Sequence, residues 1–481
     1  MSTAASQGLP ASVPPVPGQG WFRNIRDLPR EHGFEPLRVE GRIPPDLAGT
    51  LYRNGASLFS NFGRPYRHWF DGDGALTAIR LTPRGAEGAV RVIESAGLLA
   101  ERAAGKPLFG GYGTRVPGFL GLLRGRFKNV ANTSVIVWNN HLLALNEPAK
   151  PTELDPRTLA TMGETDLGGA IPRAFSAHPH HVRERGAAYN FGVRYGRRTE
   201  LDLFELPDAG PARRMATLTL AGASMIHDFI ATPNYLIFFA PPLRLRVLRL
   251  LLGIASYSDS LAWRPEVGTE VIVVPIDQPG DARRFTVEPF FQWHFSNAFE
   301  RGREIIVDFV RHADFNTNKW LGNVMTGDPG MEVDGHYGRA TLDPGRGALK
   351  YEERWDVSCE FPRVGSSVVG QPHRFAYLNA HSTPERSRQG LFDEVIRLDV
   401  ESGRAERVTL GPEQYPSEPL FVPAKDADGE DDGYLLTLVY DGVSDTSHLA
   451  ILDARSLGRG ALARVHFDHA IPFTFHGFWQ G

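Results

Sequence analysis

The segment Val274-Pro-Ile-Asp-Gln-Pro-Gly280 ends an apolar strand in a turn rich in proline and glycine, and its repetition along the chain predicts the architecture. Similar segments bring the number of such turns to seven in 481 residues. The other copies, roughly 50 to 75 residues apart from one to the next, are Ile79-Arg-Leu-Thr-Pro-Arg-Gly85, Leu154-Asp-Pro-Arg-Thr158, Phe204-Glu-Leu-Pro-Asp-Ala-Gly210, Leu342-Asp-Pro-Gly345, Leu398-Asp-Val-Glu-Ser-Gly403 and Leu452-Asp-Ala-Arg-Ser456. A four-stranded propeller blade takes about 40–50 residues, and loop insertions supply the excess. The pattern predicts an all-β, seven-bladed β-propeller; the alternative is a sandwich of unrelated hairpins with further domains.

The composition supports a large, turn-rich protein and excludes some functions. The chain has 51 Gly and 36 Pro residues, which favour turns over long helices, and 42% hydrophobic residues, enough for a large core. A net charge of -4 leaves no basic excess to bind nucleic acid. Cys359 is the single cysteine, so a disulfide framework and a thiolate metal site are both excluded, and we expect a reducing, cytoplasmic location.

The chain divides into two parts, residues 1–20 and residues 21–481. Residues 1–20 are rich in Ser, Pro, Ala and Gly and lack a basic start before an apolar run, so we expect a disordered tail rather than a signal peptide. We expect residues 21–481 to form a single propeller domain. No stretch of 18 apolar residues occurs, so no membrane span is expected.

Two segments mix leucine with arginine and interrupt the strand pattern. They are residues 116–127 and residues 242–256, and the second contains Arg244, Arg246 and Arg249. Apolar residues interleaved with arginine are typical of a membrane interface, where guanidinium groups reach the lipid headgroups. We expect these segments to dock on a membrane surface; the alternative is an ordinary helix packed on the core.

Four histidines lie in short apolar or aromatic frames, at His178, His227, His294 and His476. A buried imidazole needs hydrogen-bond partners or a metal ion. A propeller axis is a place where ligands from different blades can converge, so the four histidines predict one metal site. Spacing alone allows His180 in place of His178, because alternate residues of a strand share a face.

Three glutamates in similar frames are candidates to hold those imidazoles in place: Glu147, Glu360 and Glu418. A metal-bound histidine usually donates its second ring N–H to a carboxylate or carbonyl. A single such glutamate is more often a surface residue, but three flanked by proline and aromatic residues favour a buried role. The remaining histidines of interest are interpreted as structural or surface residues: His373, His381, His466 and His469.

An ordered series of motifs resembles the carotenoid cleavage oxygenases almost from end to end. The motifs are Gly49-Thr-Leu-Tyr-Arg-Asn54, His68-Trp-Phe-Asp-Gly-Asp-Gly74, Lys128-Asn-Val-Ala-Asn-Thr133, Ala177-His-Pro179, Met225-Ile-His-Asp-Phe229, Glu360-Phe-Pro-Arg363, Glu418-Pro-Leu-Phe-Val-Pro423 and His476-Gly-Phe478. Within the family, Gly113-Thr-Arg-Val-Pro-Gly118 followed by the motif at 128–133 resembles the bacterial apocarotenoid oxygenases that form retinal.

The resemblance implies a seven-bladed propeller capped on one face by helices and loops, with cap insertions that include residues 105–130 and 240–264. It implies one Fe(II) per chain, held by four histidines that three glutamates orient, and it selects His178 over His180. The metal ligands would be His178, His227, His294 and His476, and the orienting residues Glu147, Glu360 and Glu418. Thr133 matches the family position beside the open side of the iron.

The implied reaction inserts both atoms of O₂ across a C=C bond of a lipophilic polyene and releases two carbonyl products. For this subgroup, the expected reaction is central 15,15' cleavage of an apocarotenoid to form retinal. The alternative substrate is a stilbene or related phenylpropanoid, but Asn146 stands where stilbene-cleaving relatives typically have a lysine. A binding or scaffold propeller that has lost catalysis is disfavoured, because every expected ligand is present. No obligate protein partner is evident.

Overall fold

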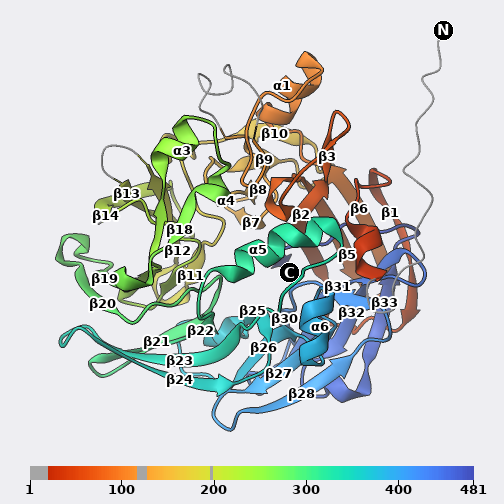
Figure 1. Ribbon diagram of the computed structural model, residues 1–481. Coiled ribbons are helices and arrows are strands. Elements are labelled where there is room, and N and C mark those ends of the chain that lie inside the picture. Colours follow the sequence, from red (N-terminus) through yellow and green to blue (C-terminus); the bar gives the residue numbers. More distant parts are fainter. Residues whose placement is uncertain (1–19, 116–126, 196–198, 221) are drawn as a thin grey trace.

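The computed structural model describes residues 20–115, 127–195, 199–220 and 222–481. Its β-sheets are arranged in a ring around a central axis, as in a β-propeller (Figure 1). The predicted tail at residues 1–20 and the predicted docking segment at 116–127 lie almost entirely outside the described residues. The predicted all-β propeller is confirmed.

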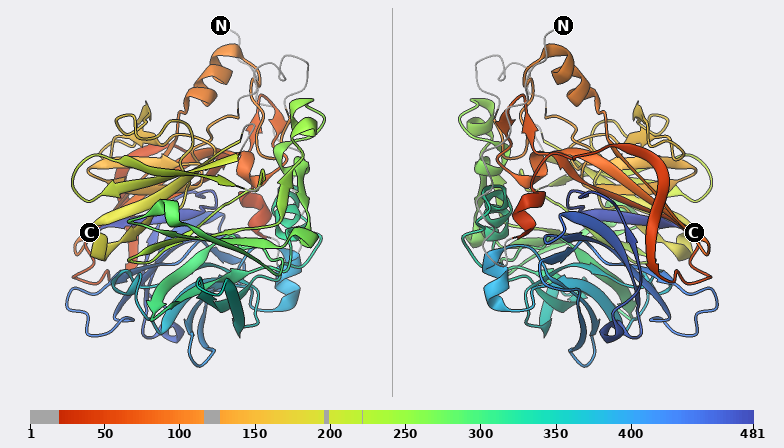
Figure 2. Two further views of the ribbon diagram at one scale, coloured as in Figure 1. Left: turned by 90° about the vertical axis from the view of Figure 1, so that its left-hand side faces the viewer. Right: turned by 90° about the vertical axis from the view of Figure 1, so that its right-hand side faces the viewer.

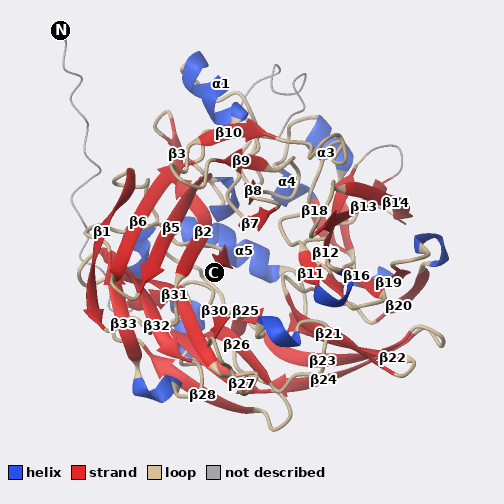
Figure 3. Ribbon diagram, turned by 180° about the vertical axis from the view of Figure 1, so that it is seen from behind, coloured by secondary structure: helices blue, strands red, loops and turns tan. Residues whose placement is uncertain are grey.

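Five blades are separate four-stranded antiparallel sheets. Figure 3 shows their first strands nearer the axis than their last, for example β21 inside β24. In chain order the strands are β7 (Ser134–Trp138), β8 (His141–Leu145), β9 (Thr152–Leu154) and β10 (Thr161–Glu164); β11 (His180–Val182), β12 (Ala187–Arg194), β13 (Thr199–Pro207) and β14 (Arg213–Leu220); β15 (Ile230–Ala231), β16 (Tyr235–Ala240), β19 (Thr269–Pro275) and β20 (Arg283–Val287); β21 (Phe295–Arg301), β22 (Glu304–Arg311), β23 (His336–Asp343) and β24 (Ala348–Trp355); β25 (Cys359–Arg363), β26 (Phe375–Ala380), β27 (Glu394–Asp399) and β28 (Arg404–Thr409).

The rest of the ring is one ten-stranded sheet, so the prediction of seven separate blades is wrong. Its order is β29 (Gln414–Pro416), β31 (Gly433–Asp441), β32 (Thr446–Asp453), β33 (Ala461–His466), β1 (His32–Gly41), β6 (Gly85–Val92), β5 (Asp73–Thr82), β2 (Gly49–Leu58) and β34 (His476–Gln480), with β30 (Leu420–Pro423) also paired to β31. The cause is β1, which pairs with β33 through Val39 and Val465 and with β6 through Leu37 and Ala86. One strand therefore joins what would otherwise be two sheets.

All seven predicted turns nevertheless join neighbouring strands of one sheet. The hairpins are β5–β6, β9–β10, β13–β14, β19–β20, β23–β24, β27–β28 and β32–β33. The first and the last of them belong to the ten-stranded sheet. The repeated pattern thus identified the hairpins correctly, whereas the number of sheets depends on pairing that no turn encodes.

Both faces of a blade are buried, as β16 illustrates. Leu236 and Phe238 pack with residues of the β11–β14 sheet, whereas Ile237 and Phe239 pack with residues of the β21–β24 sheet. Because successive side chains of a strand point to opposite faces, a blade between two neighbours needs apolar residues at every position. This explains the continuous apolar run from 236 to 240.

Helices and short hairpins gather mainly on one face of the ring (Figure 2). They comprise α1 (Ala96–Ala104), α3 (Val247–Leu251), α4 (Tyr257–Ser260), α5 (Asn316–Asn323), α6 (Pro384–Gln389), and the pairs β3 (Ser60–Asn61) with β4 (Arg64–Pro65) and β17 (Leu243–Leu245) with β18 (Leu261–Trp263). The insertion predicted at 240–264 supplies α3, α4, β17 and β18. No helix in the described ranges combines the length and apolar character needed to cross a membrane.

Candidate metal centre

The four predicted histidines converge near the axis because each lies at or just before the start of an edge strand. His178 precedes β11, His227 precedes β15, His294 immediately precedes β21, and His476 is the first residue of β34. Since these strands come from four parts of the ring, their starting ends bring distant residues together.

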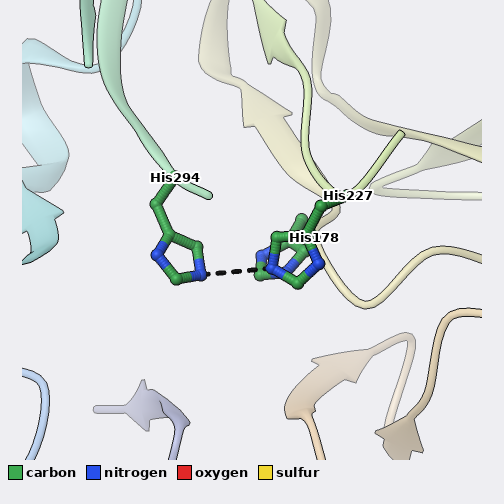
Figure 4. Close-up of side chains that lie close together, drawn as sticks. All are labelled: His178, His227 and His294. Atoms are coloured by element: carbon green, nitrogen blue, oxygen red, sulfur yellow. Dashed lines mark hydrogen bonds between the residues drawn. The ribbon is translucent and has the colours of Figure 1, made fainter. Parts of the chain in front are cut away.

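Three of the imidazoles form a compact group, shown in Figure 4. The Nε2 atoms of His178 and His227 lie 3.1 Å apart, and those of His227 and His294 lie 3.4 Å apart. The potential ligand atoms of the three residues all lie within 4.8 Å of one another. His476 completes the set: its ring centroid lies 4.8 Å from that of His178 and 4.7 Å from that of His294, compared with 5.2 Å between His178 and His294.

Each predicted glutamate meets a different predicted histidine. Glu360 Oε2 lies 2.6 Å from His294 Nδ1, and Glu418 Oε1 lies 2.9 Å from His476 Nδ1. Glu147 contacts His227 Nδ1. An ionised carboxylate only accepts hydrogen bonds, so each of these Nδ1 atoms carries the proton and each Nε2 keeps its lone pair.

The burial of these groups does not prevent the glutamates from being ionised. Burial alone would raise the pKa of Glu360, but hydrogen bonds and charge from His294 and His312 hold it below its usual value. The pKa of Glu418 is likewise lowered, despite burial, by Arg363, His476 and Arg53. Burial and the neighbouring imidazoles hold the pKa of His178 well below its ordinary value, so its ring is neutral.

The donor set fits a transition-metal ion. The Nε2 atoms of His227 and His294 face each other at 3.4 Å with two lone pairs, an arrangement that is repulsive without a cation between them. Metal–imidazole bonds of about 2.1 Å would place neighbouring ligand nitrogens roughly 3.0 to 3.4 Å apart. Imidazole suits iron, copper, zinc or nickel, whereas calcium requires oxygen ligands.

A cavity of about 790 Å³ opens over the histidines. Its wall contains Thr133, whose hydroxyl donates to Asn132 Oδ1 at 3.0 Å, and many aromatic side chains. The aromatic residues in the wall include Trp69, Phe70, Trp293, Phe361 and Phe475. Such a volume and lining are typical of a site for an apolar small molecule.

Other histidines serve the fold. His180 Nε2 lies 3.0 Å from Asp228 Oδ1, and His381 Nε2 lies 3.0 Å from the carbonyl of Gly390. His373 is buried against Asp308 and Asn297, while His466 and His469 pair with Glu40 and Asp468. The imidazole of His178, and not that of His180, belongs to the compact group of histidines.

Sequence reasoning did not single out Arg53, Arg363 and His312. Arg53 and Arg363 bond to Glu418, and His312 Nε2 lies 3.5 Å from Glu360 Oε1. Both arginines lie inside the quoted motifs at 49–54 and 360–363, and an arginine within an apolar strand was the available signal. His312 follows the apolar run of β22 without a distinctive frame.

Fold and site together define a class: β-propellers with a cluster of histidines on the axis that could hold a metal ion, beside a cavity whose wall contains aromatic residues. Residues 25–481 match the family model described as retinal pigment epithelial membrane protein. The chain belongs to this family, that of the carotenoid cleavage oxygenases, as its motifs predicted, and it is an oxidoreductase of the dioxygenase kind.

Relatives with different names share the whole length of the chain. It is 34% identical over 477 residues to the apocarotenoid-15,15'-oxygenase of Synechocystis sp., covering 96% of each chain. It is 29% identical to lignostilbene-alpha,beta-dioxygenase isozyme III of Sphingomonas paucimobilis, covering 95% of each. The crystal structure of the cobalt-substituted Synechocystis oxygenase superposes with a TM-score of 0.87 at 32% identity, covering 96% of this chain and 98% of that one.

Proposed function

We propose that this protein is a non-haem Fe(II) dioxygenase that cleaves one C=C bond of an apocarotenoid, at the central 15,15' position, and forms retinal. The observation that carries the proposal is the cluster of four histidines at the floor of an aromatic cavity. The similarity to an apocarotenoid-15,15'-oxygenase supports the substrate. The reaction balances without a further reductant, since both atoms of O₂ enter the two carbonyl products.

One Fe(II) per chain would be held by His178, His227, His294 and His476. When bound, the iron supplies the activation of O₂. The four imidazoles are neutral ligands, so they leave the full charge of the ion in place. Glu147, Glu360 and Glu418 keep three Nδ1 atoms protonated and so keep the Nε2 lone pairs directed inward.

The cavity wall contributes placement. A rigid apolar wall holds a polyene with one alkene over the histidines and excludes water. This placement converts the reaction of the alkene with O₂ into an effectively unimolecular step. Phe361 illustrates this rigidity: its ring stacks on His294 with centroids 5.3 Å apart. The methyl group of Thr133 would limit access to the open side of the metal.

A stilbene or phenylpropanoid is the second candidate substrate, because a lignostilbene dioxygenase is a full-length relative. Asn146 argues against it. The Asn146 amide lies 3.3 Å from Asn132 Oδ1 and 3.4 Å from Thr133 Oγ1, and it offers no cation to stabilise a phenolate.

Product masses separate the two substrates. The iron-loaded enzyme is incubated with apocarotenals, full-length carotenes and hydroxystilbenes, and the carbonyl products are weighed by mass spectrometry. We expect retinal from apocarotenals and turnover of hydroxystilbenes at least about a hundredfold lower, equivalent to about 2.7 kcal/mol in the barrier. Efficient cleavage of hydroxystilbenes with none of apocarotenals would transfer the assignment to the second candidate.

We further propose that residues 21–481 act as one catalytic unit in the cytoplasm, peripheral to a membrane from which the polyene is drawn. Leu248 and Leu252 on and beside α3 are 74% and 63% exposed. Their neighbours Leu245 and Leu250 line the cavity. An exposed apolar surface next to the cavity wall suits insertion into a lipid interface.

The double change Leu248→Asp with Leu252→Asp tests this docking. Each exposed leucine that enters lipid contributes about 1.5–3 kcal/mol, so we expect liposome binding in a sedimentation assay to fall more than tenfold. Val443→Asp with Leu462→Asp, which alters two exposed apolar residues of the β31–β33 region, is the matched control. Equal liposome binding by both double variants would show that α3 does not dock.

A further inference from the structure

Two of the histidine–glutamate pairs, those of Glu360 and Glu418, differ in how many other donors the glutamate serves. Glu360 accepts from His294 Nδ1 at 2.6 Å, from the Phe361 backbone N–H at 2.6 Å and from His312 at 3.5 Å. These partners include no permanently charged group. The His294 pair therefore has a carboxylate whose negative charge is directed mainly to its histidine.

Glu418 serves four donors, two of them guanidinium groups. Its Oε1 accepts from His476 Nδ1 at 2.9 Å and from Arg363 Nε at 2.7 Å. Its Oε2 accepts from Arg53 Nη1 at 3.0 Å and from the Gly477 N–H at 2.9 Å. Arg363 thus shares one oxygen with His476 and is the nearer of the two.

Arg53 is built into the fold around His476. Its side chain is fully buried, and its remaining donors go to Thr474 Oγ1 at 3.0 Å and to the Phe475 carbonyl at 3.2 Å. A Cβ atom on Gly477 would come within 2.6 Å of Arg53 Cδ, so the guanidinium lies directly under the strand. Arg53 therefore holds the two residues that precede the ligand as well as its glutamate.

Arg363 reaches the same carboxylate from outside and is 41% exposed. Arg53, Arg363 and Glu418 together carry a net charge of +1. A carboxylate that is neutralised by two arginines is a weaker acceptor for a neutral imidazole N–H, because charge-assisted bonds are roughly twice as strong as neutral ones. A weaker bond at Nδ1 leaves less electron density at Nε2, and the metal–ligand bond there is weakened.

We propose that His294 and His476 bind the metal unequally, that His476 is the weaker ligand of the two, and that Arg53 and Arg363 are the positioning residues that make it so. The inference rests on the proposed function, since it takes the four histidines as one ligand set. One further observation agrees with it: the His476–Glu418 bond, at 2.9 Å, is longer than the His294–Glu360 bond, at 2.6 Å. The metal is then held more firmly on the side of β21 than on the side of β34.

Release of Co²⁺ to excess EDTA tests the role of the arginines in the full-length protein. The metal alone is the probe, and its visible ligand-field absorption reports the coordination. We expect Arg363→Met to slow Co²⁺ release by about three- to tenfold, because the bond between Glu418 and His476 becomes stronger. We also expect the absorption band to shift. The melting temperature of the apo variant checks that it is folded.

Arg173→Met is the matched control. Arg173 lines the same cavity, but within the described ranges it forms neither a hydrogen bond nor an ion pair with the three glutamates. Its loss removes one positive charge from the cavity wall without removing a partner of Glu418, and we expect release to slow by less than about twofold. Equal effects of the two changes, or faster release from Arg363→Met, would overturn the proposal.

A comparison of ligands supplies an independent measurement. We expect His476→Ala to bind Co²⁺ at least about tenfold more tightly than His294→Ala does. Equal or reversed affinities would show that the ligands are not ranked as proposed. A wild-type protein that takes up neither Fe²⁺ nor Co²⁺ would instead refute the proposed function, which separates the two failures.

Discussion

His294→Ala is expected to release the bound metal and to lower turnover by at least about a thousandfold, equivalent to about 4 kcal/mol in the barrier. His294 belongs to the compact group, and its Nδ1 lies 2.6 Å from Glu360 Oε2. Its loss leaves three histidines, and it leaves the buried charge of Glu360 without its principal partner. Metal content by elemental analysis and product formation from an apocarotenal are the measurements.

His336→Ala is the control, because His336 also bonds a glutamate, Glu353 at 3.0 Å, but lies in β23 on the surface. It should keep both metal and turnover. Stoichiometric iron in His294→Ala would remove this histidine from the ligand set and, with it, the proposed centre.

Glu360→Gln is expected to weaken metal binding by about 10- to 100-fold while the protein stays folded. The amide keeps the size of the side chain but removes the charge that holds the proton on His294 Nδ1. His294 and the Phe361 N–H both contact Oε2, so the amide oxygen can keep these two bonds, and the N–H₂ group that replaces Oε1 faces His312.

The control for this change is Glu353→Gln, which alters the exposed glutamate beside His336. Competition with a metal-binding dye gives the affinities, and thermal unfolding of the apo proteins gives the stabilities. Unchanged affinity in Glu360→Gln would mean that Glu360 supports the fold but does not orient a ligand.

The sequence predicted the local parts of this fold well and the long-range parts poorly. A turn such as Leu398–Gly403 is encoded by the residues within it, and the structure places a hairpin there. The union of two sheets depends on pairs such as Val39 with Val465, which are distant in the chain. No local pattern specifies such a pair, because either edge of β1 could have remained unpaired.

The same distinction holds at the site. His294 stood out because an imidazole between Trp293 and Phe295 has few reasons to be buried without a function. Arg53 did not, because its importance lies in contacts with Glu418 and Phe475, more than 350 residues away along the chain. An arginine in a strand is usually a solvated residue, so only the structure reveals its burial.

The strand that unites the ten-stranded sheet has a consequence for the order of folding. β1 can pair with β33 only after almost the whole chain between them has been brought into a loop. Closing such a loop costs several RT in conformational entropy, and this cost grows with the logarithm of the number of residues enclosed. His476 arrives only when β34 has paired with β2, across a similar separation. The apo chain should therefore complete the slow pairing that closes the ring of sheets first. Binding of the ion should be a late event that stabilises an already closed ring.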